Sequence, residues 1–117
     1  MPDPNDYSAY PEHPLKGRMR LAYDWIPNGA QRLLDAGCSS GYATRFFAEK
    51  CPETYGIEIS DNVEVARKRY PHIRFFRGGL ESTPFDDNFF DVILLSAVLA
   101  PADSERLALD EMYRILK

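Results

Sequence analysis

The sequence predicts an α/β domain built on a parallel β-sheet, and three observations support this prediction. An apolar strand end at residues 33–34 changes to a helical pattern within a few positions, across two glycines. A second apolar segment, residues 54–59, follows the expected helix and carries a carboxylate near its end. Residues 91–96 contain an unbroken apolar run, which is typical of a parallel strand covered on both faces. A chain of 117 residues can form one domain with a modest core.

The N-terminal part is expected to be an extension followed by one helix. Residues 1–14 are rich in Pro, Asp and Tyr, a composition that favours an extended or poorly ordered chain. Apolar side chains recur at helical spacing over residues 15–25, and the Pro-Asn-Gly run at 27–29 ends the helix. We therefore divide the chain into residues 1–29, an N-terminal extension and cap helix, and a ligand-binding domain, residues 30–117.

The turn after the first strand is the part of the sequence best suited to hold a ligand. Gly37 and Gly41 allow a tight turn with little side-chain obstruction, so a ligand can approach the backbone closely. A helix is expected from near Gly41 to about Lys50, where Cys51 and Pro52 end it. Its first N–H groups and the positive end of its dipole favour an anion such as a carboxylate or phosphate.

Asp35 decides which ligand fits this turn. It places a negative charge at the end of the strand, beside the positive helix start, and this pair suits a zwitterion. An amino acid headgroup would put its ammonium near Asp35 and its carboxylate at the helix start, whereas a pyrophosphate would be repelled. The G-x-x-x-G spacing also differs from the G-x-G-x-x-G of dinucleotide folds, which disfavours a nicotinamide-dependent oxidoreductase. Tyr42 after Gly41 excludes a P-loop.

Glu58 is the second candidate binding residue. It lies about 20 positions after the glycine turn, near the tip of the next strand, where an acidic side chain can accept hydrogen bonds from both ribose hydroxyls. Ile59 beyond it can pack on an adenine face. The alternative for Glu58 is an interaction with the dipole of the helix that begins near Ser60.

The remaining elements complete an alternating pattern. A helix capped by Ser60 or Asp61 leads to Pro71 and a third strand at 73–76. The fourth strand at 91–96 precedes a last helix, which begins at Asp103 or Ser104. This helix should direct four apolar residues inward and form an ion pair between residues 110 and 114. Those inward residues are Leu107, Ala108, Met112 and Ile115.

Two segments resemble the class I S-adenosylmethionine-dependent methyltransferases. Residues 34–41, Leu-Asp-Ala-Gly-Cys-Ser-Ser-Gly, resemble the first motif of that family, D-x-G-C-G-x-G, with Ser39 in place of the middle glycine. Residues 78–91 resemble the segment G-D-A-E-x-L-P-F-x-D-x-x-F-D, whose beginning touches adenine, with Gly79 in place of the aspartate. The resemblance implies a Rossmann-like three-layer sandwich with parallel strands in the order 3-2-1-4, the front part of a seven-stranded sheet.

The resemblance also implies S-adenosylmethionine as the cofactor. It implies methyl transfer to a small-molecule acceptor by in-line attack on the sulfonium, which requires alignment more than acid–base chemistry. We therefore name no catalytic residue. Ser96 would face the methyl group, and a covering N-terminal segment would make Tyr7, Tyr10, His13 and Tyr23 candidate substrate contacts, with packing as the alternative. The expected cofactor-binding residues are Asp35, Gly37, Cys38, Ser39, Gly41, Glu58, Ile59, Gly79, Leu80 and Ser96.

A non-catalytic function is the main alternative. A half-domain that holds the cofactor weakly, or not at all, would act by pairing through the open edge of the fourth strand, as a homodimer or with a partner chain. Ser39 and Gly79 depart from the family pattern, and Ala100-Pro101 replaces an acidic residue and a histidine. The early stop after Lys117 adds to this alternative.

Composition narrows the partners and the location. The net charge of −4 and the absence of a dense basic run argue against nucleic acid, and residues 67–69 are expected on a solvated face. No apolar run is long enough for a membrane span, and the N-terminus lacks signal-peptide features, so we expect a cytoplasmic protein. Cys38 and Cys51 fit reduced thiols and match no metal-ligand spacing. Cys38 is expected to act through its backbone N–H, although a nearby helix start can lower a thiol pKa.

Overall fold

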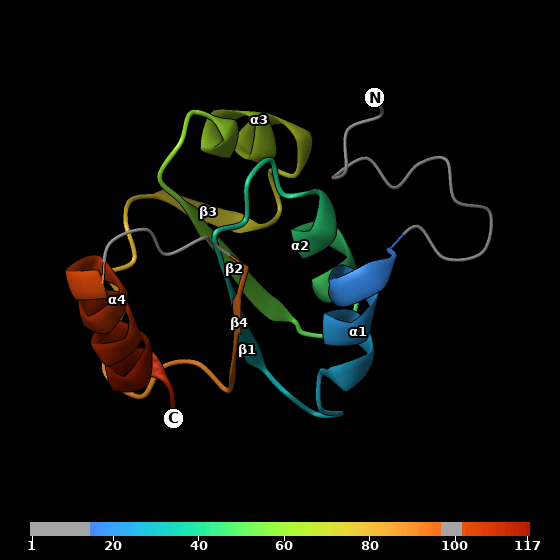
Figure 1. Ribbon diagram of the computed structural model, residues 1–117. Coiled ribbons are helices and arrows are strands. Elements are labelled where there is room, and N and C mark those ends of the chain that lie inside the picture. The colour runs from blue at the N-terminus through green and yellow to red at the C-terminus, as the bar shows by residue number, and fades with distance from the viewer. Residues whose placement is uncertain (1–14, 97–101) are drawn as a thin grey trace.

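The computed structural model describes residues 15–96 and 102–117 (Figure 1). Helices and strands alternate along most of this length, as the sequence predicts. The elements are α1 (Gly17–Trp25), β1 (Arg32–Ala36), α2 (Tyr42–Phe47), β2 (Glu53–Glu58), α3 (Asn62–Arg69), β3 (Arg74–Arg77), β4 (Val92–Leu95) and α4 (Ala102–Ile115).

The four strands form one parallel sheet in the order β3-β2-β1-β4, which confirms the predicted topology. Leu33 of β1 lies opposite Thr54 on one side and Val92 on the other. Because all strands run in the same direction, their carboxyl ends meet at one edge of the sheet. That edge carries the ends of β1, β2 and β4, and therefore the loops that follow them.

Helices cover both faces of the sheet, giving the expected three layers. Figure 1 shows α4 on one face and α1, α2 and α3 toward the other. Strand β1 alternates accordingly: Leu34 and Ala36 belong to the cluster that contains Met112 of α4, whereas Leu33 packs in the cluster with Phe47 of α2. Each of the larger side chains, the leucines, Phe47 and Met112, contributes about 1.5–3 kcal/mol on burial.

Helix α1 lies beside α2, and its two flanking residues anchor it. Leu15 and Ile26 are buried in the Leu33–Phe47 cluster, and Met19 packs against the same cluster from within the helix. The ammonium of Lys50 also donates a hydrogen bond to the Tyr23 carbonyl, at 2.7 Å. Helix α1 is therefore held next to the loop that joins β1 to α2.

The loop before β4 is tied to α4 by a charged cluster that we call the α4 anchor: Thr83, Asp87, Glu111 and Arg114. Glu111 accepts hydrogen bonds from the Thr83 N–H and hydroxyl, both at 2.7 Å. Arg114 donates to Glu111 at 2.7 Å and to Asp87 at 2.6 Å. The Arg114 contact holds the pKa of Glu111 at about 2 despite partial burial, with Thr83 adding to the effect.

Several expected details of the elements are wrong. Helix α2 ends at Phe47 rather than near Lys50, because the N–H groups of residues 49 and 50 bond three residues back and form tight turns. Leu107 is 55% exposed instead of facing the core. Arg114 pairs with Glu111, three residues before it, rather than with the expected partner Asp110, four residues before it.

Strand β4 also differs from the expectation of a strand covered on both faces. Among the described residues it is the edge strand, and its side chains are half-buried, with Leu95 40% exposed. Helix α4 starts at Ala102, so Asp103 and Ser104 lie inside the helix rather than before it. Within the described part of the chain, no helix combines the length and apolar character required to cross a membrane.

Candidate functional site

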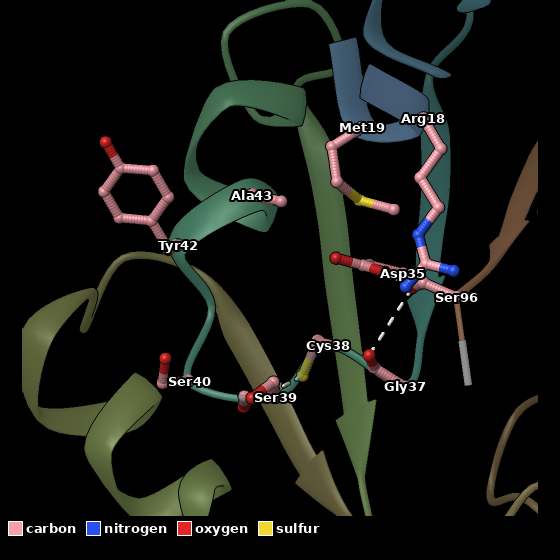
Figure 2. Close-up of a pocket in the computed structure, with 10 residues that line it drawn as sticks. All are labelled: Arg18, Met19, Asp35, Gly37, Cys38, Ser39, Ser40, Tyr42, Ala43 and Ser96. Carbon is pink, nitrogen blue, oxygen red and sulfur yellow. Dashed lines mark hydrogen bonds between the residues drawn. The ribbon is translucent and has the colours of Figure 1, made fainter. Parts of the chain in front are cut away.

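A cavity of about 190 Å³ opens at the carboxyl edge of the sheet, beside the end of β1 (Figure 2). Helix α1, the β1–α2 loop, the start of α2 and the residue after β4 all contribute to its walls. The lining residues are Arg18, Met19, Asp35, Gly37, Cys38, Ser39, Ser40, Tyr42, Ala43 and Ser96.

The loop between β1 and α2 makes the floor of this cavity, and its backbone is sharply folded. Gly37, Ser39 and Gly41 have φ values of 88°, 52° and 83°, all in the left-handed region. A side chain at Gly41 would collide with α3 and β3, because a Cβ there would lie 2.8 Å from the Phe75 ring and 3.1 Å from Ala66. The predicted tight glycine turn is therefore present, and Ser39 adopts a conformation that costs a non-glycine residue energy.

Asp35 lies at the base of the cavity with little contact to solvent, at 2% exposed. Its carboxylate accepts a hydrogen bond from the Thr44 hydroxyl at 2.7 Å and another from the Ser96 hydroxyl at 2.8 Å. Burial raises the pKa of Asp35; the two hydroxyls oppose that rise, and the nearby Glu58 carboxylate adds to it. The geometry leaves Asp35 with hydroxyl partners and without a countercharge in contact among the described residues.

Glu58 closes the other side of the loop from the end of β2. Its carboxylate oxygens accept the N–H of Ser39 at 2.9 Å and the N–H of Ser60 at 2.9 Å. Burial raises the pKa of Glu58, but hydrogen bonds from the N–H groups of Ser60 and Ser39, with smaller contributions from the Ser60 hydroxyl and the Ile59 N–H, bring the pKa below its usual value. The contact with Ser60, just before α3, is compatible with the dipole alternative as well as with ribose binding.

The predicted residues divide into two groups around this loop. Five of them line the cavity, namely Asp35, Gly37, Cys38, Ser39 and Ser96. The other five do not line the cavity: Gly41 supports the loop, Glu58 holds it, and Leu80 is buried in the core on the α4 face. Ile59 is 67% exposed, and a Cβ built on Gly79 would lie 3.7 Å from its side chain.

Cys38 is a buried thiol, not an activated one. Burial and the carboxylates of Asp35 and Glu58 raise its pKa, which disfavours the alternative that the nearby helix start activates the thiol. Its backbone N–H donates to the Ile57 carbonyl at 3.1 Å, which engages the group expected to contact a ligand. Cys38 and Cys51 are both free thiols, and the described residues contain no cluster suited to a metal ion.

Six residues at the site were not among the predicted binding residues: Arg18, Met19, Ser40, Tyr42 and Ala43, which line the cavity, and Thr44, a hydrogen-bond partner of Asp35. Thr44 donates its hydroxyl to Asp35 from the first turn of α2. Its position three residues after Gly41 is a local sequence signal by which it could have been found. Arg18 and Met19 reach the cavity from α1, and only the docking of that helix brings them there. Tyr23 packs against the core cluster, as the packing alternative predicts. Tyr7, Tyr10, His13, Ala100 and Pro101 lie outside the described residues.

A second hollow of about 220 Å³ adjoins the first, between α1 and β4. The two hollows share Arg18, Met19 and Ser96. The rest of the second hollow is apolar, lined by Ala22, Phe47, Ile93, Leu94 and Leu95. Polar groups thus concentrate at the loop, and apolar surface extends away from it toward β4.

Comparison with known proteins matches this arrangement. The methyltransferase domain family matches residues 34–117. The chain is 30% identical over 88 residues to the malonyl-[acyl-carrier protein] O-methyltransferase of Serratia marcescens, a match that covers 74% of this chain and 34% of the relative. The chain therefore spans about a third of the length of that curated relative.

Solved structures share the fold. YcgJ from Bacillus subtilis superposes with a TM-score of 0.71 at 28% identity, over 85% of this chain and 45% of that one. The amino pentose methyltransferase CalS10 of Micromonospora echinaspora, solved with S-adenosylmethionine bound, gives a TM-score of 0.68 at 30% identity, over 86% of this chain and 42% of that one. The four strands described here correspond to less than half of each of those proteins.

Proposed function

The chain belongs to the S-adenosylmethionine-dependent methyltransferase family, and from that premise we propose that its cavity binds S-adenosylmethionine for methyl transfer to a small-molecule acceptor. The observation that carries the proposal is Asp35, a buried carboxylate at the cavity base whose partners are hydroxyls rather than a cation. A bound ammonium or sulfonium would supply the missing positive charge.

The second carboxylate supports the same orientation of the cofactor. Glu58 holds the loop through Ser39 and sits at the tip of β2, the neighbour of β1. In the proposed complex it accepts hydrogen bonds from the ribose, with the exposed Ile59 side chain against one adenine face. The amino acid end of the cofactor then lies over Asp35, and the nucleoside end lies toward β2 and Gly79.

The acceptor would approach from the apolar hollow between α1 and β4. Ser96 lines both hollows and donates its hydroxyl to Asp35, and this supports the proposal that it lies next to the methyl group. The protein's part in the reaction is alignment of the acceptor with the sulfonium, and no acid–base residue is required for that step. We also propose that residues 1–29 are an N-terminal extension and cap helix, that residues 30–117 are the cofactor-binding domain, and that the protein is cytoplasmic.

Titration calorimetry with S-adenosylmethionine and S-adenosylhomocysteine tests the proposal directly. Glu58→Ala should weaken binding by about 1–3 kcal/mol, the scale for hydrogen bonds to a charged group. Glu53→Ala is a matched control. Glu53 is the first residue of the same strand and pairs with Arg32 at the amino ends of the strands, away from the cavity. A folded protein that gives no heat with either ligand would exclude the proposal for this chain, and equal affinities of Glu58→Ala and wild type would remove Glu58 from the ribose.

Pairing through β4 is the second candidate function. Its support is that β4 is the edge strand of the described sheet, with Leu95 partly exposed. Light scattering after size exclusion gives the mass of the particle, and a concentration-independent monomer would count against homodimerisation. A charged residue on the edge, Leu95→Lys, should convert a dimer to a monomer if the strands pair.

A further inference from the structure

Arg18 is a positively charged residue at the site, and the proposed function gives it no role. It stands in the first turn of α1 and lines both the loop cavity and the apolar hollow beside it. Figure 2 shows its side chain extending from α1 toward Ser96 and the end of β1, with the guanidinium near Asp35 in the view. The direction of this side chain is toward the cavity rather than along the helix surface.

Arg20, two residues further along, behaves differently. It donates from Nε to both carboxylate oxygens of Asp24, at 3.0 Å and 3.1 Å, one turn further along α1. Arg18 makes no such ion pair with any of the residues that the structure describes. Two arginines on one short helix are thus distinguished by their surroundings: one is compensated on the surface, and the other faces the cavity.

The charges lining the cavity form a single pair of opposite sign. Of the ten lining residues, Arg18 is the one cationic side chain and Asp35 the one acidic side chain. They come from different walls, Arg18 from α1 and Asp35 from the end of β1. An α-amino acid headgroup carries the complementary pair, since its ammonium matches Asp35 and its carboxylate matches Arg18.

The start of α2 is a weaker partner for that carboxylate than the sequence suggested. The helix has six residues, so its dipole is short, and its N-cap Gly41 has no side chain to orient a ligand. An arginine supplies parallel N–H donors that match the two oxygens of a carboxylate.

We propose that Arg18 binds the carboxylate of the cofactor's amino acid end, so that α1 forms one wall of the cofactor site. This inference rests on the proposed function. It assigns the two charges of the headgroup to two elements, β1 for the ammonium and α1 for the carboxylate. Helix α1 is positioned for this contact by the buried residues Leu15 and Ile26 at its ends.

A pair of ligands separates this contact from the rest of the site. S-adenosylhomocysteine contains the amino acid headgroup, whereas 5′-methylthioadenosine has the same nucleoside and a thioether without the headgroup. Calorimetric titration of both ligands is carried out with wild type, Arg18→Gln and Arg18→Lys. Arg20→Gln is the matched control from the same helix, and thermal unfolding of each variant checks that the fold is intact.

Arg18→Gln should weaken S-adenosylhomocysteine binding about five- to twentyfold and change 5′-methylthioadenosine binding less than about twofold. Arg18→Lys should recover part of the loss, because it keeps the charge and loses the paired donors. Arg20→Gln should leave both affinities unchanged. The proposal is overturned if Arg18→Gln binds S-adenosylhomocysteine as wild type does, or if it weakens both ligands equally. Failure of the wild type to bind either ligand would instead overturn the proposed function, and Arg18's role with it.

Discussion

The carboxylates at the β1–α2 loop and in the α4 anchor have opposite electrostatic surroundings. In the α4 anchor, Glu111 contacts the guanidinium of Arg114, and its pKa falls to about 2. Asp35, below the loop, is more deeply buried and has two hydroxyl partners, and burial raises its pKa. One carboxylate is stabilised as an anion by the fold itself, and the other is left with a charge that the fold does not neutralise.

This difference distinguishes structural from binding groups. The α4 anchor joins the segment before β4 to α4 and is electrostatically complete, so it should contribute to stability and have little effect on ligands. The loop region carries left-handed residues and an uncompensated buried carboxylate, both of which lower stability unless a ligand uses them. Substitutions of the two carboxylates should therefore act on different measurements: Glu111 on stability and Asp35 on ligand binding.

The largest loss of stability should come from the loop, with Gly41→Ala. A Cβ at this position would lie 2.8 Å from the Phe75 ring, and the residue has a φ of 83°. Backbone strain and crowding together should lower the free energy of unfolding by about 2–4 kcal/mol, measured by urea denaturation.

Gly29→Ala separates the two contributions to that loss. Gly29 has a φ of 86°, but a Cβ there would have no neighbour within 4 Å, so this variant carries backbone strain alone. It should lose about 1 kcal/mol. Equal losses for the two glycines would mean that the packing of the loop against Phe75 is not tight.

Glu111→Gln should weaken the α4 anchor and leave the cofactor site unaffected. The variant loses charged hydrogen bonds to Arg114 and to Thr83, and the free energy of unfolding should fall by about 1–2 kcal/mol at pH 7. Asp110→Asn is the control on the same helix, because Asp110 is exposed and the expected pair with Arg114 is not formed. An equal loss in both variants would contradict a specific role for Glu111.

The pH dependence of the same variant has a definite sign. Folding lowers the pKa of Glu111 from 4.5 to about 2, so its contribution is complete above pH 4.5 and is lost as the pH falls toward 2. The difference in stability between wild type and Glu111→Gln should therefore be constant from pH 5 to 7 and shrink between pH 4.5 and 2. A difference that grows on acidification would refute this assignment.

The strands could be predicted because each carries a signal that is local in sequence, namely the apolar runs that became β1, β2 and β4 and the glycines at 37 and 41. Parallel connections alone allow several strand orders, and the order 3-2-1-4 was predicted from the resemblance to the methyltransferase family. The limits of α2 and the exposure of Leu107 depend on how helices pack, and sequence spacing alone does not determine that.

The site was predicted in part for the same reason. Asp35 and Glu58 stand out by their positions at the carboxyl ends of strands, and Ser96 was selected as the residue after β4. The hydrogen bond between Ser96 and Asp35 joins residues 61 positions apart, and Arg18 reaches the cavity only through the docking of α1. Contacts of this kind have no local signal, and they provide the charge pairing on which ligand choice depends.

Asp35→Asn should have the opposite effect to Glu111→Gln: it should weaken ligand binding and leave stability unchanged or slightly higher. Removing a buried charge that lacks a countercharge should leave the protein as stable as wild type at pH 7, or more stable by about 1 kcal/mol. The same change should weaken S-adenosylhomocysteine binding about tenfold in calorimetry, because the ammonium loses its anionic partner.

Acidification provides an internal control for Asp35→Asn. Since folding raises the pKa of Asp35 above its usual 3.8, the cost of its charge is greatest at neutral pH and disappears when the group is protonated. Any stability gained by the variant should vanish as the pH is lowered to 3. A variant that is much less stable than wild type at pH 7, with unchanged ligand affinity, would make Asp35 a structural group like Glu111.

The smallest effect should come from the left-handed residues that are not glycine, of which each region contains one. Ser39 in the loop has a φ of 52°, and Asn88 beside the α4 anchor has a φ of 54°. Asparagine tolerates this conformation better than serine, because its side chain bonds the local backbone. Ser39→Gly should therefore raise the free energy of unfolding by about 0.5 kcal/mol, whereas Asn88→Gly should change it by less than about 0.3 kcal/mol. Replicate urea titrations can resolve this order, and a larger gain at Asn88 would place the greater backbone strain beside the anchor instead of at the loop.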